Sequence, residues 1–408
     1  MERNQAADIR MAGHSILERN LKHTLVSIIV VNRNYAAYVG DTIQSIRAQD
    51  YPWFECFIID NASTDDSLAV IERHVADDPR FTVQTLPENL GQLRGALQVF
   101  DRLRGEFVVS VDADDFLFPN FLSSHMQVHL ALAVPVGFTS SNFVEIDANR
   151  NLLTAGRGDF GTNSEPDQRG LKPAAEALRL SAISDADYAR LSDATFIVPN
   201  WKTQWVWAPG TSNFFRKSAL NVALPDTSRI FGHAGWENYF CTIVHILSGS
   251  ALISQHLSAY RYHGKNAFSM APRLNAVRTY RNFAARRSAT QRLHALCTLL
   301  SRAGEFNWIL SGNRFWPTLD LLAGIESTTP RKYFSSGEVQ EIFAEYMKAL
   351  VDAFGERVVF ENLRKRMGRV STWRLARETH GGRLPLSARW MLTKVEIQRA
   401  REKRRRRD

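Results

Sequence analysis

Residues 107–115 read Phe-Val-Val-Ser-Val-Asp-Ala-Asp-Asp, a short run of strand-forming residues that leads directly into three carboxylates. An apolar run of this length is typical of a strand that is buried on both faces of a parallel sheet. Three carboxylates so close together repel one another unless a cation offsets their charge. Oxygen ligands suit divalent ions such as Mn²⁺ or Mg²⁺. The acidic turn therefore indicates a metal site, although an isolated turn of this composition is also common on a solvated surface.

Strands and helices alternate on the N-terminal side of this turn. The strands are expected at residues 25–31, 55–59, 81–84 and 107–111, and the helices from residue 38, over 66–75 and over 91–103. Such alternation is typical of a doubly wound α/β sheet. In an open sheet of this kind, ligands bind beyond the carboxyl ends of the strands.

Polar residues follow three of the four strands and would face that ligand-binding edge. They are Asn32 and Asn34 after the first strand, Asp60 after the second, and the acidic turn after the fourth. No Gly-x-Gly-x-x-Gly or Gly-Lys-Ser/Thr loop follows any strand, so neither a dinucleotide-binding fold nor a P-loop kinase is supported. Side chains or a cation must therefore neutralise a bound phosphate.

The composition is that of a folded globular protein. Of the 408 residues, 44% are apolar and 23% are charged, values near the average for globular domains. The sequence has no apolar run long enough to span a membrane, and its first ten residues lack the apolar stretch of a secretory signal. Cys56, Cys241 and Cys297 are widely spaced, which suggests neither a disulfide framework nor a zinc cluster. We therefore expect a cytoplasmic protein.

The net charge of +9 is concentrated at the C-terminal end, where residues 401–407 are almost all Arg or Lys. A basic block of this kind is usually a solvated tail, but it can also attract nucleic acid or anionic lipid. Trp390, Met391 and Leu392 precede the block, so an interfacial segment attracted to anionic lipid is the leading hypothesis. A peripheral membrane contact is expected, and nucleic acid is not an expected partner.

Four motifs together resemble the family 2 inverting glycosyltransferases, which have the GT-A fold. They are VSIIVVNRN (residues 26–34), QDYPWFE leading to IIDNASTD (49–65), NLG (89–91) and DADD (112–115). The resemblance implies a Rossmann-like mixed sheet that binds a nucleotide-diphospho-sugar. It also implies transfer of a hexose-type sugar from a UDP-sugar donor to a glycan or lipid-linked acceptor, as in bacterial surface polysaccharide assembly.

The same resemblance implies roles on the donor side of the sheet. Asp60 would accept a hydrogen bond from the uracil ring, while Asn32 and Asn34 would line the base and ribose pocket. Asp112 would lie near the ribose or the sugar hydroxyls. Asp114 would ligate Mn²⁺ or Mg²⁺ between the two phosphates.

Basic residues further along the chain are candidates for contact with the donor. Arg94, on the helix after the third strand, could reach it. Residues 259–266 read AYRYHGKN and resemble the family's Tyr-Arg-x-His segment, which closes over the diphosphate. By that resemblance His263 is a metal ligand or a diphosphate contact, and Arg261 or Lys265 holds phosphate charge. Outside this context a lone histidine or arginine is most often a structural or solvated residue.

An inverting transfer requires a base that deprotonates the acceptor hydroxyl while UDP leaves. Residues 232–240 read GHAGWENYF and resemble the family's Gly-Glu-Asp-Trp segment at a helix start. Matching residue by residue places Glu237 at the catalytic Asp and Trp236 at the preceding Glu. Glu237 could instead stabilise the helix N-terminus, and Asp226 and His233 are the other nearby candidates.

These interpretations divide the chain into four parts. They are a leader (1–24), a glycosyltransferase domain (25–270), a helical C-terminal region (271–383) and a basic tail (384–408). Within the domain we expect a donor-binding half (25–135), an insertion (136–204) and an acceptor half (205–270). In the helical region, residues 339–354 follow the spacing of one amphipathic helix. The tail would bring the enzyme to the inner face of a membrane.

Two other functions stay open from the sequence. Nucleotidyl transfer also uses an α/β sheet with carboxylate-bound Mg²⁺, but it normally brings a Gly-rich basic loop after the first strand, which is absent here. A membrane- or nucleic-acid-associated scaffold without activity is favoured by the basic tail and by the altered Glu-Asp segment. The donor-side turns favour the transferase.

Overall fold

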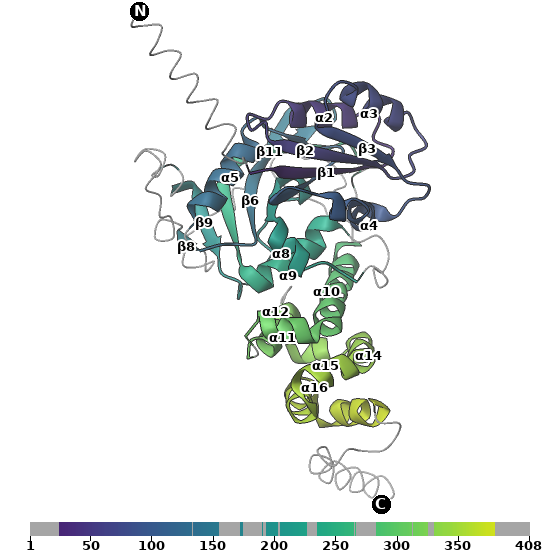
Figure 1. Ribbon diagram of the computed structural model, residues 1–408, viewed down its shortest axis with the longest axis vertical. Helices are drawn as coiled ribbons and strands as arrows, with labels where there is room; N and C mark the ends of the chain where they lie inside the picture. Colours follow the sequence, from purple (N-terminus) through teal and green to yellow (C-terminus); the bar gives the residue numbers. More distant parts are fainter. Residues whose placement is uncertain are drawn as a thin grey trace, which may run out of the picture.

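The computed structural model describes residues 24–132, 134–154, 172–173, 190, 193–202, 205–226, 235–264, 266, 283–311, 313–324 and 330–379. A mixed sheet with helices on both faces is followed by a group of helices that extends away from it (Figure 1). This arrangement confirms the α/β class and the helical extension expected from the sequence. The predicted leader, apart from Thr24, and the basic tail lie outside the described residues. None of the helices in the described ranges is long and apolar enough to cross a membrane.

The first four strands form the parallel half of the sheet, in the order β3-β2-β1-β4. Val26 at the start of β1 pairs with Phe54 and Phe107, and Asn32 at its end pairs with Asp60. The turns that follow these strands therefore lie at one edge of the sheet. The bounds are β1 (Val26–Asn32), β2 (Phe54–Asp60), β3 (Phe81–Thr85) and β4 (Phe107–Asp112).

Helices cover both faces of the parallel half. Apolar residues of α2 (Val39–Arg47), α3 (Ser67–Val75) and α5 (Phe121–Ala131) share one core, and α4 (Gly91–Leu97) packs in the other. The predicted helix over 91–103 is shorter in the structure, since α4 ends at Leu97 and a 3-10 turn follows over Phe100–Arg102. The chain becomes extended at Leu103. This lets the Gly105 amide donate to Ser27 Oγ at 2.9 Å before β4 begins.

The second half of the sheet is mixed. β10 lies antiparallel between β4 and β6, and β11 is parallel to β6. The bounds are β5 (Phe116–Leu117), β6 (Phe138–Asp147), β7 (Leu152–Thr154), β8 (Lys172–Pro173), β9 (Thr195–Val198), β10 (Asn213–Arg216) and β11 (Ser250–Tyr262).

Strand β6 lies within the predicted insertion over 136–204, so the start of that segment is part of the sheet. Its ten residues lie in the middle of the sheet, so this part of the segment belongs to the core of the domain. The strand was missed because four consecutive residues, TSSN from 139 to 142, are polar yet buried. Tertiary contacts satisfy them: Thr139 Oγ1 bonds His125, and Ser140 Oγ accepts from the Ala208 amide at 3.0 Å.

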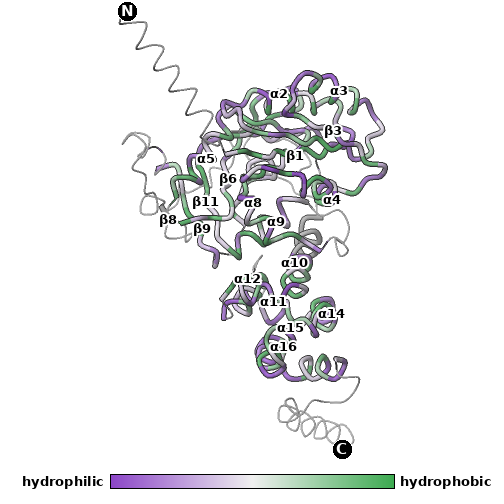
Figure 2. Tube along the Cα trace, in the orientation of Figure 1, coloured by the Kyte–Doolittle hydropathy of each residue, from purple (hydrophilic) through white to green (hydrophobic). Residues whose placement is uncertain are grey.

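The core on the α4 side of the sheet continues into the helical region through α9. Tyr239 on α9 bonds Thr298 on α10 at 2.8 Å, hydroxyl to hydroxyl. Figure 2 shows hydrophobic residues along the central strands and also within these helices. The bounds are α8 (Lys217–Val222), α9 (Trp236–Ser248), α10 (Phe283–Ser301), α11 (Ala303–Ile309), α12 (Phe315–Gly324), α13 (Pro330–Phe334), α14 (Gly337–Glu345), α15 (Met347–Phe354) and α16 (Glu356–Thr379).

The prediction of one helix over 339–354 is wrong, since α14 and α15 are separated at Tyr346, with φ −91° and ψ 10°. Val339, Phe343, Met347 and Leu350 nevertheless enter the same core. A break at a single residue leaves the apolar spacing almost unchanged, so the pattern could not reveal it.

Candidate active site

The carboxyl ends of β1 and β2 hold Asn32 and Asp60 side by side. Asn32 Nδ2 donates to Asp60 Oδ1 and to Ser63 Oγ, both at 3.1 Å, and the Ser63 amide donates to Asp60 Oδ2 at 3.1 Å. Asn34, with φ 59°, accepts at Oδ1 from the Thr64 amide at 2.7 Å. These bonds fix the orientation of the Asp60 carboxylate at the ligand-binding edge predicted from the sequence.

The three carboxylates of the acidic turn point in different directions. Asp115 faces the interior, where Oδ2 accepts from Thr211 Oγ1 at 2.7 Å and Oδ1 accepts from the Arg261 amide at 3.0 Å. Burial, followed by the nearby charge of Asp114, raises the pKa of Asp115 well above its usual value. Asp115 therefore holds the turn in place, and it is not positioned to share an ion with the other two carboxylates.

Arg261 also has a structural position. Its side chain is 1% exposed, and it donates to the Asp114 carbonyl at 2.8 Å and to Asp41 Oδ2 at 2.9 Å. The expectation that Arg261 holds donor phosphate is therefore wrong, because its guanidinium is enclosed and already bonded. Lys265, the alternative, lies outside the described residues.

His263 and Asp114 form the pair in which a metal could bind. His263 Nε2 lies 2.8 Å from Asp114 Oδ2. The Tyr38 ring stacks on the imidazole at 4.8 Å, and the Tyr35 ring meets it edge-on at 5.6 Å, so the imidazole is held in orientation. Burial and the charges of Asp114 and of its two acidic neighbours raise the Tyr35 pKa, which places this hydroxyl close to the acidic turn.

The Asp114 and His263 pair fits a divalent ion with octahedral geometry. Adjacent ligands at bonds of about 2.1 Å lie about 3 Å apart, close to the observed 2.8 Å. The Asp114 oxygen is a ligand that suits Mg²⁺ or Mn²⁺, and an imidazole nitrogen is a common ligand of transition metals. Within the ranges that the structure describes, no three His, Cys, Asp or Glu side chains form such a cluster. The protein would therefore supply two ligands, and the remaining positions would be open to oxygens of a ligand or water.

The carboxylates of Glu237 and Asp112 both lie close to Gly210. A Cβ added at Gly210 would lie 3.1 Å from Asp112 Oδ2 and 3.5 Å from Glu237 Oε2. Glu237 lies in the first turn of α9, and its Oε1 accepts from Asn238 Nδ2 at 2.8 Å. Burial, followed by the charges of Asp115, Glu237 and Asp114, raises the pKa of Asp112 well above its usual value. The carboxylates therefore create a negative potential at the point where they meet.

Gln92 links the Asp112 carboxylate to the first turn of α9, a role that sequence reasoning missed. Its Nε2 donates to Asp112 Oδ1 at 2.5 Å, and its Oε1 accepts from the Trp236 amide at 3.0 Å. The side chain thus connects the end of β4 to the first turn of α9. Its position directly after Gly91 in the Asn-Leu-Gly motif was the only available signal.

The other candidates lie apart from this cluster or cannot be placed. Arg94 is exposed on α4, and its guanidinium has no hydrogen bond or ion pair among the residues that are described. Asp226 ends a described segment, and His233 falls outside the described residues. Trp236 is fully buried, 4.4 Å from the Phe240 ring, so a core residue occupies the position of the family's first acid.

The acidic side chains thus gather at the carboxyl ends of the parallel strands of a mixed sheet. The model described as Glycosyl transferase family 2 matches residues 27–170. This part of the chain is therefore similar to the family 2 glycosyltransferases, as the motifs indicated.

Three comparisons describe its relatives. The putative teichuronic acid biosynthesis glycosyltransferase TuaG of Bacillus subtilis is 28% identical over 123 residues, which are 30% of this chain and 49% of TuaG. Chondroitin synthase of Escherichia coli is 32% identical over 136 residues, 32% of this chain and 19% of that protein. The crystal structure of S. aureus TarS residues 1–349 in complex with UDP-GlcNAc aligns with 88% of each chain at 14% identity and a TM-score of 0.40, too remote a likeness to assign a ligand. The chain spans about half the length of TuaG.

Proposed function

We propose that this protein is a metal-dependent, inverting glycosyltransferase. It transfers a sugar from a UDP-sugar donor to a glycan or lipid-linked acceptor in surface polysaccharide biosynthesis. The observation that carries the proposal is the approach of Glu237 and Asp112 to one point at Gly210, close to the Asp114 and His263 pair. A base on one side of a reacting sugar and a cation-binding pair on the other are what an inverting transfer needs.

The donor lies along the carboxyl ends of β1, β2 and β4. Asp60, held by Asn32 and Ser63, is oriented to accept a hydrogen bond from the base of the nucleotide. Asn34 lines the same pocket from the turn after β1. Asp112 accepts hydroxyl groups of the ribose or of the sugar. Arg94 is the most distant candidate and contacts the donor only if the donor extends over α4.

Asp114 and His263 hold Mn²⁺ or Mg²⁺, which when bound supplies positive charge beside the diphosphate. Glu237 takes the proton from the acceptor hydroxyl as its oxygen bonds the anomeric carbon, while the bond from that carbon to UDP breaks and UDP leaves. Its position at the N-terminus of α9 supports a charged carboxylate, because the helix dipole is positive there.

The acceptor is a polymer or a lipid-linked glycan. This is supported by the names of two relatives, which refer to teichuronic acid biosynthesis and to chondroitin synthesis. The enzyme acts in the cytoplasm, and the basic tail holds it at the inner face of the membrane by attraction to anionic lipid.

The direct test is release of UDP from a panel of UDP-sugars with Mn²⁺, with and without EDTA. We expect release with at least one sugar and its loss in EDTA. The donor assignment is rejected if calorimetry detects no binding of UDP or of any UDP-sugar.

Two substitutions separate the proposed roles. Asp114→Asn should remove the dependence on Mn²⁺, and an unchanged metal response would exclude Asp114 as a ligand. Glu237→Gln should bind UDP as the wild type does but lose transfer. Retained turnover would exclude Glu237 as the base and favour Asp226 or His233. Glu338→Gln, in the first turn of α14, is the matched control and should change neither property.

A further inference from the structure

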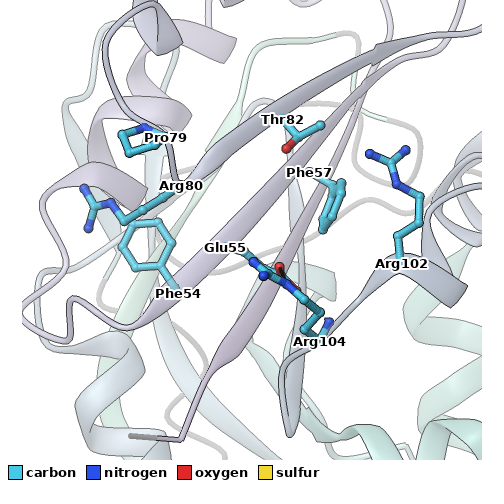
Figure 3. Close-up of a pocket in the computed structure, with 8 residues that line it drawn as sticks. All are labelled: Phe54, Glu55, Phe57, Pro79, Arg80, Thr82, Arg102 and Arg104. Carbon is cyan, nitrogen blue, oxygen red and sulfur yellow. Dashed lines mark hydrogen bonds and ion pairs between the residues drawn. The ribbon is translucent and has the colours of Figure 1, made fainter. Parts of the chain in front are cut away.

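A hollow of about 380 Å³ lies at the amino ends of β2 and β3. Figure 3 shows Arg80 next to Phe54 on one side of it and Arg102 next to Phe57 on the other, with Arg104 and Glu55 below. Volumes of this size are typical of small-molecule sites. The hollow is therefore large enough for a ligand of sugar-phosphate size.

The hollow is separate from the proposed donor site. Its strand residues begin at Phe54, whereas Asp60 ends the same strand. With a rise of about 3.3 Å per residue, the two ends of β2 are roughly 20 Å apart. A ligand in the hollow therefore cannot touch the donor-side carboxylates.

Two of the guanidinium groups are held flat on aromatic rings. Arg80 lies 4.2 Å over the Phe54 ring and is bonded to Asp78 through Nε and a terminal nitrogen at 2.9 and 2.7 Å. Arg102 lies 4.9 Å over the Phe57 ring. Stacking and the fixed bonds restrict both side chains before a ligand arrives, which lowers the entropy cost of binding.

The third guanidinium, that of Arg104, lies beside the Glu55 carboxylate, whose two oxygens already accept hydrogen bonds. Glu55 Oε1 accepts from Ser27 Oγ at 2.8 Å and from the Arg104 amide at 2.7 Å, and Oε2 accepts from Arg104 Nε at 2.8 Å. Burial raises the pKa of Glu55, but these bonds outweigh it and leave the pKa below its usual value. Glu55 is only 6% exposed, whereas the Arg104 side chain is 75% exposed. An approaching anion therefore meets the guanidinium rather than the carboxylate.

Positive charge is in excess at this hollow. Arg80 is balanced by Asp78 and Arg104 by Glu55. Within the described part of the chain, Arg102 bonds only a neutral amide, Gln84 Oε1 at 2.8 Å. Its remaining N–H groups keep the fork geometry that binds phosphate oxygens in pairs.

We propose that this hollow is a second binding site, in which Arg102, assisted by Arg104, binds a phosphate group carried by a ligand of sugar-phosphate size. The phosphate belongs either to a water-soluble sugar phosphate or to a lipid headgroup. The site does not depend on the proposed donor site, since the two share no residue.

Isothermal titration of the full chain with glucose 1-phosphate tests the proposal, with saturating UDP and Mg²⁺ present to fill the donor site. We expect binding that weakens at least about 10-fold in Arg102→Gln, the loss of a charge-assisted bond. Arg102→Lys should be intermediate, because it keeps the charge and loses the fork. Arg73→Gln, an exposed arginine of α3, is the matched control and should bind as the wild type does.

Sedimentation with phosphatidylglycerol vesicles distinguishes the two sources. Vesicle binding that requires Arg102 assigns the lipid headgroup, and binding of glucose 1-phosphate alone assigns the soluble ligand. The proposal is overturned if Arg102→Gln binds both probes as the wild type does, or if neither probe binds. Failure of UDP to bind would reject the donor site and leave the Arg102 comparison valid.

Discussion

Gly210 lies close to both the candidate base Glu237 and the candidate donor contact Asp112. A methyl group there would lie 3.1 Å from Asp112 Oδ2, so it would occupy room that the reacting sugar needs. We expect Gly210→Ala to lower kcat by ~10-fold or more while the melting temperature changes little. A matched control is Gly304→Ala in α11, where an added Cβ meets nothing within 4 Å. Equal activity of Gly210→Ala and the wild type would place the reaction elsewhere.

Gln92 is expected to act as a positioning residue, because it bonds both the Asp112 carboxylate and the first turn of α9. Gln92→Ala removes a hydrogen bond to a charged group, which costs about 1.5 kcal/mol or more, so kcat should fall ~10-fold. Binding of UDP should persist. Gln98→Ala is the control, since among the described residues the Gln98 side chain bonds only the Arg94 carbonyl. A purely structural role would lower stability and leave kcat of the folded enzyme unchanged.

At the scale of elements, Asp41 of α2 binds two arginines in different environments. Arg261 of β11 is buried, whereas the Arg150 side chain is 62% exposed. Breaking a buried pair costs about 3–5 kcal/mol, and an exposed pair about 0–1 kcal/mol. We therefore expect Arg261→Met to lower the free energy of unfolding strongly in urea titrations and Arg150→Met to change it little. Similar losses in the two variants would contradict this assignment.

The sequence was most informative for strands that consist of a continuous apolar run. β1 and β2 were predicted closely because their apolar runs are buried on both faces. β6 was not, because its buried Ser and Thr residues receive hydrogen bonds from residues distant in the chain. Helix α4 was predicted too long, because the contact that begins β4 is with Ser27, far away in sequence.

For the molecule as a whole, buried imidazoles predict acid sensitivity. Burial lowers the pKa of His245 to about 4, partly opposed by the Lys202 carbonyl, and lowers that of His129 to about 3. As the pH falls below about 6.5, these histidines therefore become protonated in the unfolded chain before they do so in the folded protein. The contribution of these histidines to the free energy of unfolding is fully present above that pH and falls toward pH 4. At pH 5 the loss is about 2 kcal/mol per histidine.

The measurement is the melting temperature from pH 7 to 5. We expect it to fall over this range and to fall less steeply in His245→Asn. His256→Asn, at an exposed position of β11, is the control and should keep the wild-type slope. A slope that is the same in all three proteins would exclude His245 as a source of the acid sensitivity.

The sequence by itself determined the parallel half of the sheet and the edge at which the site lies, since both follow from local apolar runs and from the residues directly after them. It also indicated the family that residues 27–170 resemble, because four motifs occur in order. Only the tertiary structure decided which carboxylates work together. It turned Asp115 and Arg261 inward, paired Asp114 with His263, and joined Asp112 through Gln92 to the first turn of α9, which carries Glu237. Such roles depend on which side chains meet across as many as 149 residues of chain, and spacing along a sequence carries no record of those contacts.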